Sequence, residues 1–299
     1  MTDYGEATEA KISEIIEACK RHGDRSIIAL SGVPGTGKSF MASIAAQRYA
    51  GEPTRVREVQ FHQSFSYDEF IEGLTIGANG EVIVKDGSFL DWNRQAKQDP
   101  DRNYVYLAEE VTRSDLSSVL GELLTYLEYR DRSFLTMHRR EPVSIADNLV
   151  LLATFNPTDR TALEIDNALL RRFRVISCPP DTDQLREMVG GDLGKNVVDK
   201  LCEIFHSCEE ENPVEYEHLM PFGHGIFDGV TQENPDLHNL WDQRIRHFLY
   251  RPGVEPHPLA ETIENNYPWT DPDYSTENGS TETGEAVEAA DMNGAEPQE

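Results

Sequence analysis

Short apolar runs recur along the first 180 residues, and segments with a helical period separate them. The apolar runs lie at residues 26–30, 55–61, 104–108, 148–155 and 173–177. The helical patterns cover residues 37–50, about 88–98, 114–130 and 161–170. Near-continuous apolar strands that alternate with helices are typical of a parallel sheet covered on both faces. The pattern therefore predicts an α/β core.

Two stretches break this alternation. The segment "GLTIGANGEVIVKDG" (73–87) contains the turn-forming pair Asn79-Gly80 and predicts a hairpin, and residues 133–145 predict a second one. Between strand and hairpin, Ser66 and Glu69 have the spacing of a capping box at a helix start. We expect the first hairpin either to be a plain insertion or to project toward a partner.

Composition divides the rest of the chain. After Pro179-Pro180 the pattern turns helical, and from residue 270 to the end there is no Lys or Arg. That last stretch has too little apolar surface to offset the entropy of ordering it. We expect an N-terminal helix at 1–23, the α/β core at 24–178, a helical region at 179–267 and a disordered acidic tail at 268–299.

The bulk composition excludes several protein classes. The 299 residues are 38% hydrophobic, which is enough for a substantial core. No apolar run is long enough to cross a bilayer, and the acidic N-terminus lacks the features of a secretory signal. We therefore expect a cytoplasmic protein that makes no membrane contact.

The charge and the cysteine content limit the kinds of partner and metal site that we expect. A formal net charge of -27 repels nucleic acid overall, and an acidic surface poor in Lys hints at a halophilic source. None of the four cysteines forms a C-x-x-C pair, which favours reduced structural thiols. Cys202, His206 and Cys208 lie close in sequence, but a zinc site would need a fourth ligand.

The strongest chemical signal is the stretch "SGVPGTGKSF" at 31–40, between a predicted strand and a predicted helix. It contains G-x-x-x-x-G-K-[ST], the pattern of a phosphate-binding loop. Backbone N–H groups of such a loop surround phosphate oxygens, and the start of the following helix adds its positive dipole. Lys38 would reach the β- and γ-phosphates, and the Ser39 hydroxyl would bind Mg²⁺. The expected nucleotide-binding residues are Gly32, Val33, Pro34, Gly35, Thr36, Gly37, Lys38, Ser39 and Phe40.

Two carboxylates end another apolar strand, in "YVYLAEEVTRSDL". Ligands of parallel sheets bind at the carboxyl ends of the strands. We expect Glu109 to act on the metal and Glu110 to polarise the attacking water. Residues in the metal-side position are usually Asp, so the longer Glu109 could displace the metal slightly and slow hydrolysis.

Further polar residues follow the next two strands. Asn156 ends the run "LLATFNPTDR" and could bond the γ-phosphate or the water, although Asn-Pro also favours a plain turn. Arg171 and Arg172 are adjacent, so they cannot both lie on one face, and one could reach into a neighbouring subunit as an arginine finger. His62 and His224 are interpreted as structural.

In this order and spacing, these motifs resemble those of AAA+ NTPases, and more narrowly of the McrB branch, the NTPases of modification-dependent restriction systems. The similar text covers about residues 24–267 and includes "VQFHQSFSYDEFIEGL" (59–74), "EEVTRSDLSSVLGELLTYLE" (109–128), "FNPTDRTALEIDNALLRRF" (155–173), "FGHGIFDG" (222–229) and "DLHNLWDQRIRHFL" (236–249). The resemblance implies an α/β core with an α-helical lid, a nucleotide at the subunit interface, and a homo-oligomeric, hexameric ring that hydrolyses ATP or GTP with Mg²⁺. It also implies a partner such as a nuclease or McrC-like activator.

Two departures from the family pattern bear on specificity. McrB itself prefers GTP and has the sensor text M-N-T-A-D-R-S, whereas this chain has "FNPTDRT" at 155–161. The run "ATFNP" is also similar to the sensor of MoxR-type ATPases, which favours ATP. Restriction McrB proteins carry a DNA-binding domain before the NTPase, but only about 24 residues precede the first strand here. We therefore expect a partner to supply target recognition.

Three functions stay open at this point. The chain is an AAA+ motor or switch that drives a restriction or anti-phage nuclease, a MoxR-like chaperone ATPase, or a weakly catalytic scaffold that uses nucleotide for assembly.

Overall fold

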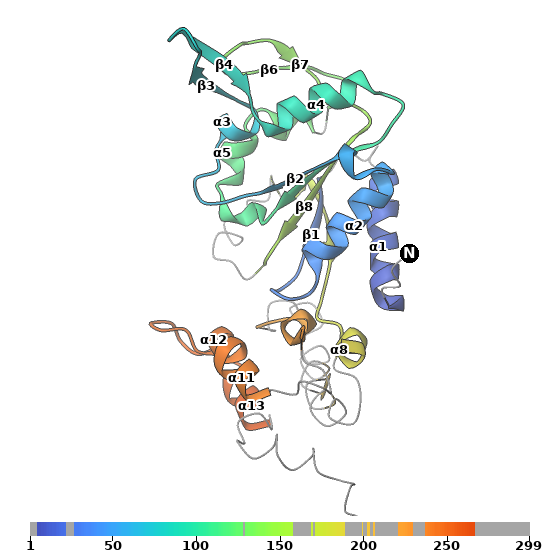
Figure 1. Ribbon diagram of the computed structural model, residues 1–299, viewed down its shortest axis with the longest axis vertical. Helices are drawn as coiled ribbons and strands as arrows, with labels where there is room; N and C mark the ends of the chain where they lie inside the picture. Colours follow the sequence, from blue (N-terminus) through green and yellow to red (C-terminus); the bar gives the residue numbers. More distant parts are fainter. Residues whose placement is uncertain are drawn as a thin grey trace, which may run out of the picture.

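Five strands form one parallel sheet in the order β2-β5-β8-β1-β9. They are β1 (Ile27–Ser31), β2 (Val56–Gln60), β5 (Tyr104–Glu109), β8 (Leu149–Phe155) and β9 (Phe173–Ser177). In the computed structural model each strand matches its predicted run to within one residue at either end. The predicted parallel sheet flanked by helices is thus confirmed (Figure 1).

The structure describes residues 5–21, 27–127, 129–157, 169, 171–188, 199, 202–203, 206, 221–229 and 237–266. The predicted helix at 161–170, apart from Leu169, and the predicted tail at 268–299 lie outside these residues.

Both faces of the sheet are covered because successive strand residues point to opposite sides. In β8, Leu149 and Leu151 belong to one hydrophobic cluster, whereas Val150 and Leu152 belong to another. The same alternation holds in β1 and β5. The uninterrupted apolar strands therefore reflect burial on two sides.

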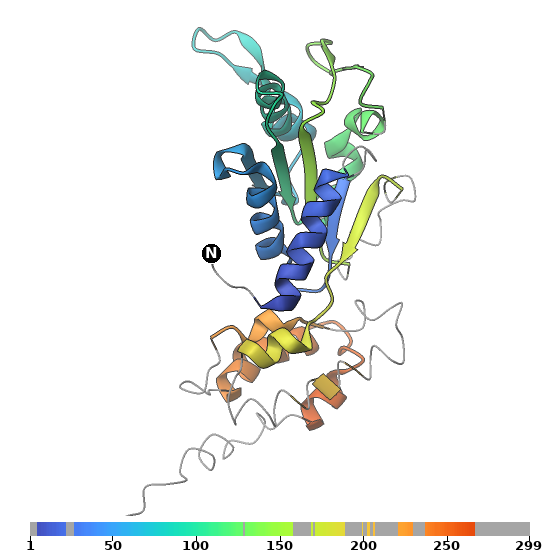
Figure 2. The same ribbon diagram turned by 90° about the vertical axis from the view of Figure 1, so that its right-hand side faces the viewer.

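Helices α1 (Glu6–Lys20) and α2 (Lys38–Ala50) lie side by side on one face of the sheet (Figure 2). Arg48 of α2 donates to both carboxylate oxygens of Glu9 in α1, at 2.6 and 2.9 Å. The cluster on the opposite face includes residues of α4 (Ser88–Gln98), α5 (Leu116–Leu120) and α6 (Leu123–Tyr126).

The continuous helix predicted at 114–130 is wrong, because the chain there forms the two short helices α5 and α6. Gly121 stands between them with φ +49° and ψ -127°, a positive-φ backbone that residues with a Cβ rarely adopt and that cannot continue a helix. A Cβ at this position would lie 2.9 Å from the Tyr67 ring. The glycine therefore permits both the break and the close approach of Tyr67.

The two predicted hairpins are present, and Figure 1 draws them at the end of the molecule far from α11–α13. The first pairs β3 (Glu72–Ile76) with β4 (Val82–Asp86), and the second pairs β6 (Phe134–Leu135) with β7 (Pro142–Val143). The predicted capping box is also confirmed, at the start of α3 (Tyr67–Phe70).

A buried carboxylate joins the hairpins. The side chain of Glu72 is fully buried, and its Oε1 accepts the backbone N–H groups of His138 at 2.6 Å and Arg139 at 3.0 Å. Arg139 in turn is paired with Asp86 of β4 and donates to the Val84 carbonyl at 2.7 Å. These bonds hold the two hairpins together as one unit.

The described C-terminal part of the chain is helical. It contains α8 (Thr182–Met188), the 3₁₀ turn η5 (His224–Phe227), α11 (Leu237–Leu240), the π-helical turn η6 (Trp241–Ile245), α12 (Arg246–Leu249) and α13 (Ala260–Asn266). Its hydrophobic cluster includes Phe222, Phe227 and Trp241, and Val33 from the loop after β1 packs into it. Among the residues described, none of the helices has the length and apolar character needed to span a bilayer.

Candidate functional site

The glycine-rich loop follows the carboxyl end of β1 and ends where α2 begins, as the sequence predicted. Gly35 (φ +84°) and Gly37 (φ +73°) both adopt left-handed backbone, which residues with a Cβ rarely do. Lys38 Nζ donates to the carbonyls of Gly32 at 2.6 Å and Val33 at 3.0 Å. The loop thus closes around the ammonium group at the N-terminus of a 13-residue helix.

Glu109 is the last residue of β5, and its side chain lies against the start of α2. The Ser39 hydroxyl donates to Glu109 Oε2 at 2.7 Å, and the Thr154 hydroxyl of β8 bonds to the same oxygen. Glu109 is 6% exposed, and its other oxygen, Oε1, is buried with no hydrogen-bond partner in the described part of the chain. A buried carboxylate oxygen without a donor is costly unless a cation compensates it.

These groups fit a magnesium ion. Mg²⁺ prefers hard oxygen ligands, and in nucleotide sites it is held by one or two protein groups together with phosphates and water. Ser39 and Glu109 supply a hydroxyl and a carboxylate that are bonded to each other. Glu109 Oε1, which has no hydrogen-bond donor among the described residues, could bind such an ion.

Glu110 follows directly and has an unusual backbone. Its φ of +56° is left-handed, a conformation of order 1–3 kcal/mol less favourable for a non-glycine residue. Its N–H donates to Thr154 Oγ1 at 3.1 Å, which fixes the backbone in this position. Its carboxylate accepts from Arg113 Nε at 2.5 Å. Strain of this kind is typical of functional sites.

A cavity of about 640 Å³ lies above these residues. Among the sequence-predicted residues it is lined by Pro34, Gly35, Gly37, Lys38, Ser39, Phe40, Glu110 and Asn156. Gly32, Val33, Thr36 and Glu109 do not line it, although Glu109 is bonded to Ser39, which does. The tertiary structure therefore brings together the ends of β1, β5 and β8 around one hollow.

The paired arginines lie away from this cavity. Arg171 is exposed, whereas Arg172 is only 7% exposed and its backbone carbonyl accepts the Ile27 N–H at 2.9 Å. The two side chains differ in exposure, as adjacent residues should. Neither lines the hollow of its own chain.

Sequence reasoning missed several residues at the site. Thr154, Gln184, His224 and Asp228 line the cavity, and Arg113 bonds Glu110. A hydroxyl near the end of an otherwise apolar strand could have pointed to Thr154. The Gly-His-Gly text around His224 could likewise have suggested a close approach to another backbone, instead of the structural role assigned to it.

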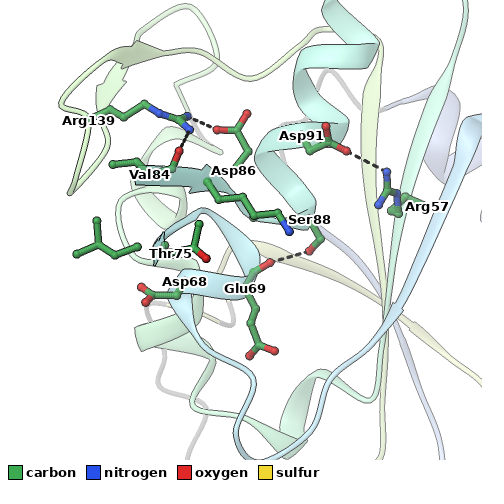
Figure 3. A pocket seen from close by; sticks show the side chains of 13 residues that line it. Arg57, Asp68, Glu69, Thr75, Val84, Asp86, Ser88, Asp91 and Arg139 are labelled. Carbon is green, nitrogen blue, oxygen red and sulfur yellow. Dashed lines mark hydrogen bonds and ion pairs between the residues drawn. The ribbon is translucent and has the colours of Figure 1, made fainter. Parts of the chain in front are cut away.

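A second cavity of about 850 Å³ lies between the first hairpin and α4 (Figure 3). Four of its charged side chains are paired with one another. Arg57 pairs with Asp91 at 3.0 Å, and Arg139 pairs with Asp86. The glycine-rich loop and the Glu109 carboxylate lie elsewhere, so the candidate nucleotide site is the cavity at the sheet edge.

Comparison with known protein families agrees with this geometry. The family model described as AAA domain (dynein-related subfamily) matches residues 27–173, which run from β1 to the start of β9. The chain therefore belongs to the AAA+ NTPases, a class that uses nucleoside triphosphates, usually with Mg²⁺.

Within that class it belongs to the McrB-like branch. It is 33% identical over 241 residues to the EcoKMcrB subunit of the type IV methyl-directed restriction enzyme of Escherichia coli (strain K12). The match covers 74% of this chain and 52% of that protein, so the chain spans about half the length of this relative.

A solved structure of a proposed ATPase from Cytophaga hutchinsonii is also similar, with 16% identity and a TM-score of 0.40. The match covers 71% of this chain and 72% of the Cytophaga chain. A score this low identifies no particular relative.

Proposed function

We propose that the chain is a Mg²⁺-dependent nucleoside triphosphatase, with ATP favoured over GTP, that works as a McrB-like motor or switch for a partner nuclease. The observation that carries this proposal is the contact between Ser39 of the phosphate loop and Glu109 of β5, beside a buried Glu109 oxygen that lacks a donor. Family membership and the restriction role of the Escherichia coli relative support it.

In this proposal, each residue around the hollow has a distinct task. N–H groups of residues 35–39 bind the phosphate oxygens, and the Lys38 ammonium, at the mouth of the loop, neutralises their charge. Ser39 and Glu109 would hold the metal, which when bound screens the charge that develops on the phosphates. These groups orient the triphosphate with its last phosphate toward the end of β8.

The attacking water would lie between Glu110 and Asn156. The Glu110 carboxylate accepts a proton from the water, and the Asn156 amide orients that water or a γ-phosphate oxygen. Both residues follow the carboxyl ends of strands and line the same cavity. Arg171, the exposed member of the pair, would act on a neighbouring subunit's nucleotide, so we propose that full turnover needs a ring.

Turnover and binding measurements test the chemistry. We expect Glu110→Gln to bind Mg·ATP while its hydrolysis falls by at least about 10²-fold, and Lys38→Ala to lose binding. Glu58→Gln and Lys20→Ala, which change exposed residues on β2 and α1, should behave as wild type. Equal turnover by wild type and Glu110→Gln would contradict the role of Glu110.

The partner and the ring need a separate measurement. We expect chains loaded with a slowly hydrolysed ATP analogue to elute as a larger, ring-sized species, and to retain a nuclease or McrC-like protein in a pull-down. A monomeric elution with both ATP and GTP analogues would contradict the ring.

The bond between Arg113 and Glu110 favours one alternative, a weakly catalytic scaffold that uses nucleotide for assembly. The Arg113 guanidinium occupies Glu110 Oε2, so that oxygen is not available to accept a proton from water. Nucleotide-dependent assembly without measurable phosphate release would favour this scaffold over the motor.

A further inference from the structure

The segment 221–229, which comes from the C-terminal part of the chain, is bonded directly to the phosphate loop. The Gly223 N–H donates to the Pro34 carbonyl at 2.7 Å, and the Gly225 N–H donates to the Gly35 carbonyl at 2.6 Å. A Cβ on Gly223 would lie 2.5 Å from the Gly35 oxygen, closer than real Cβ atoms come. Glycine is therefore needed beside His224 so that the two backbones can meet.

This pairing carries the His224 side chain to the wall of the nucleotide cavity. His224 is 4% exposed and lines the hollow. Its Nε2 lies 3.9 Å from the position that a Cβ on Gly37 would occupy, so it stands beside the loop residue that precedes Lys38.

The other ring nitrogen determines where the proton is. His224 Nδ1 accepts the backbone N–H of Asp181 at 3.1 Å, and burial lowers the pKa of the imidazole. A neutral imidazole whose Nδ1 accepts has its hydrogen on Nε2. In the part of the chain that the structure describes, Nε2 is bonded to no acceptor, so this N–H donor is available at the cavity wall.

We propose that His224 Nε2–H donates a hydrogen bond to an α- or β-phosphate oxygen of the bound nucleotide. The inference rests on the proposed function, because it needs a nucleotide in the cavity. Gly37 belongs to the part of the loop that surrounds the α- and β-phosphates, so His224 contacts nucleoside diphosphates as well as triphosphates. As a neutral donor it orients the phosphate chain and adds no charge.

The same residue connects the cavity to the helical region. Asp181, whose N–H holds the His224 ring, also accepts the N–H groups of Asp183 and Gln184 through Oδ1, at 2.9 and 3.0 Å. Gln184 lines the cavity as well. Phosphate binding at His224 would therefore stabilise the contact between the start of α8, segment 221–229 and the loop.

Two substitutions distinguish the role of the Nε2 donor from that of the Nδ1 acceptor. In His224→Asn the side-chain oxygen can replace Nδ1 as the acceptor for Asp181, but no donor reaches the position of Nε2. In His224→Gln the longer amide can place an N–H near that position. We expect His224→Asn to weaken the binding of both Mg·ADP and Mg·ATP about tenfold in calorimetry, and His224→Gln to recover most of the loss.

The wild-type chain offers a readout that does not depend on folding of the variants. With ¹⁵N-labelled histidine, we expect the His224 Nε2 resonance, identified by its loss in His224→Gln, to shift when Mg·ADP is added. Equal affinity of wild type and folded His224→Asn, or an unmoved resonance at saturating nucleotide, would overturn the inference alone. A wild type that binds neither nucleotide would overturn the proposed function first, and this inference with it.

Discussion

The Ser39 hydroxyl donates to Glu109 Oε2 at 2.7 Å, although 70 residues separate the two in sequence. β8 lies between β1 and β5 in the sheet, so this bond spans the top of the central strand. The hydroxyl of Thr154, near the end of β8, donates to the same carboxylate oxygen. Two hydroxyls, from α2 and from β8, therefore fix the position of one carboxylate oxygen.

The first prediction concerns Thr154. Thr154→Val keeps the shape but removes the hydroxyl that bonds Glu109 and accepts the Glu110 N–H. Partners that orient a metal ligand typically contribute about 10–100-fold in metal affinity. We expect the Mg²⁺ concentration for half-maximal hydrolysis to rise by that factor.

Nucleotide binding without Mg²⁺ should be unchanged in this variant, because the phosphate loop is intact. Thr75→Val, on the exposed hairpin, is the matched control. An unaltered Mg²⁺ requirement in Thr154→Val would show that the hydroxyl does not position the carboxylate.

The second prediction concerns the bond between Arg113 and Glu110. Arg113→Ala removes the guanidinium that holds the Glu110 carboxylate at 2.5 Å. Without Arg113, this carboxylate oxygen is available to accept a hydrogen bond from the attacking water, so we expect phosphate release per chain to rise severalfold with the affinity for Mg·ATP unchanged. Steady-state phosphate assays measure this, with the exposed Arg132→Ala as control. Falling turnover in Arg113→Ala would mean that Arg113 assists the reaction.

The third prediction concerns the junction of the hairpins. Glu72→Gln keeps the size of the side chain but replaces a buried charged acceptor of two backbone N–H groups. Hydrogen bonds to charged groups contribute roughly 1.5–3 kcal/mol each, and the amide retains part of that. We expect the free energy of unfolding to fall by about 1.5–3 kcal/mol in urea titrations.

The matched control for this variant is Glu81→Gln, an exposed residue in the hairpin loop, which should change stability by no more than about 0.5 kcal/mol. If Glu72→Gln and Glu81→Gln unfold at the same urea concentration, the buried carboxylate does not stabilise the hairpin pair.

The fourth prediction concerns pH. Burial lowers the pKa of His224 and of His257, and in each residue Nδ1 accepts a backbone N–H, from Asp181 and Leu259 respectively. The unfolded chain takes up protons on these groups near pH 6.5, and the folded chain does so only at lower pH. Below about pH 6.5 the unfolded state therefore binds more protons, and the free energy of unfolding falls as pH falls.

His257 lies outside the nucleotide cavity, so it isolates this effect from binding. His257→Asn keeps an acceptor for Leu259 but cannot titrate. We expect this variant to lose less stability than wild type between about pH 7.5 and about pH 5.5 in urea unfolding. Equal losses in the two proteins would contradict the contribution of His257.

Much of the fold could be predicted because its strands are buried on both faces. A run such as 148–155 is apolar at every position except Asn148 and Thr154, a pattern that is typical of a central parallel strand buried on both faces. The helix at 114–130 was mispredicted because periodicity alone does not reveal that Gly121 adopts positive φ under the Tyr67 ring. That conformation depends on a contact between distant segments.

The amino-acid sequence by itself determined the chemistry that is available: a glycine-rich loop ending in Lys38 and Ser39, acidic residues after one strand, and Asn156 after another. These are local patterns, and the backbone rules behind them act over a few residues. The tertiary structure alone decided which side chains meet. The order β5-β8-β1 brings Ser39, Thr154 and Glu109 together, and segment 221–229 carries His224 to the phosphate loop. Such contacts join residues tens to nearly two hundred positions apart, and no short-range pattern encodes them.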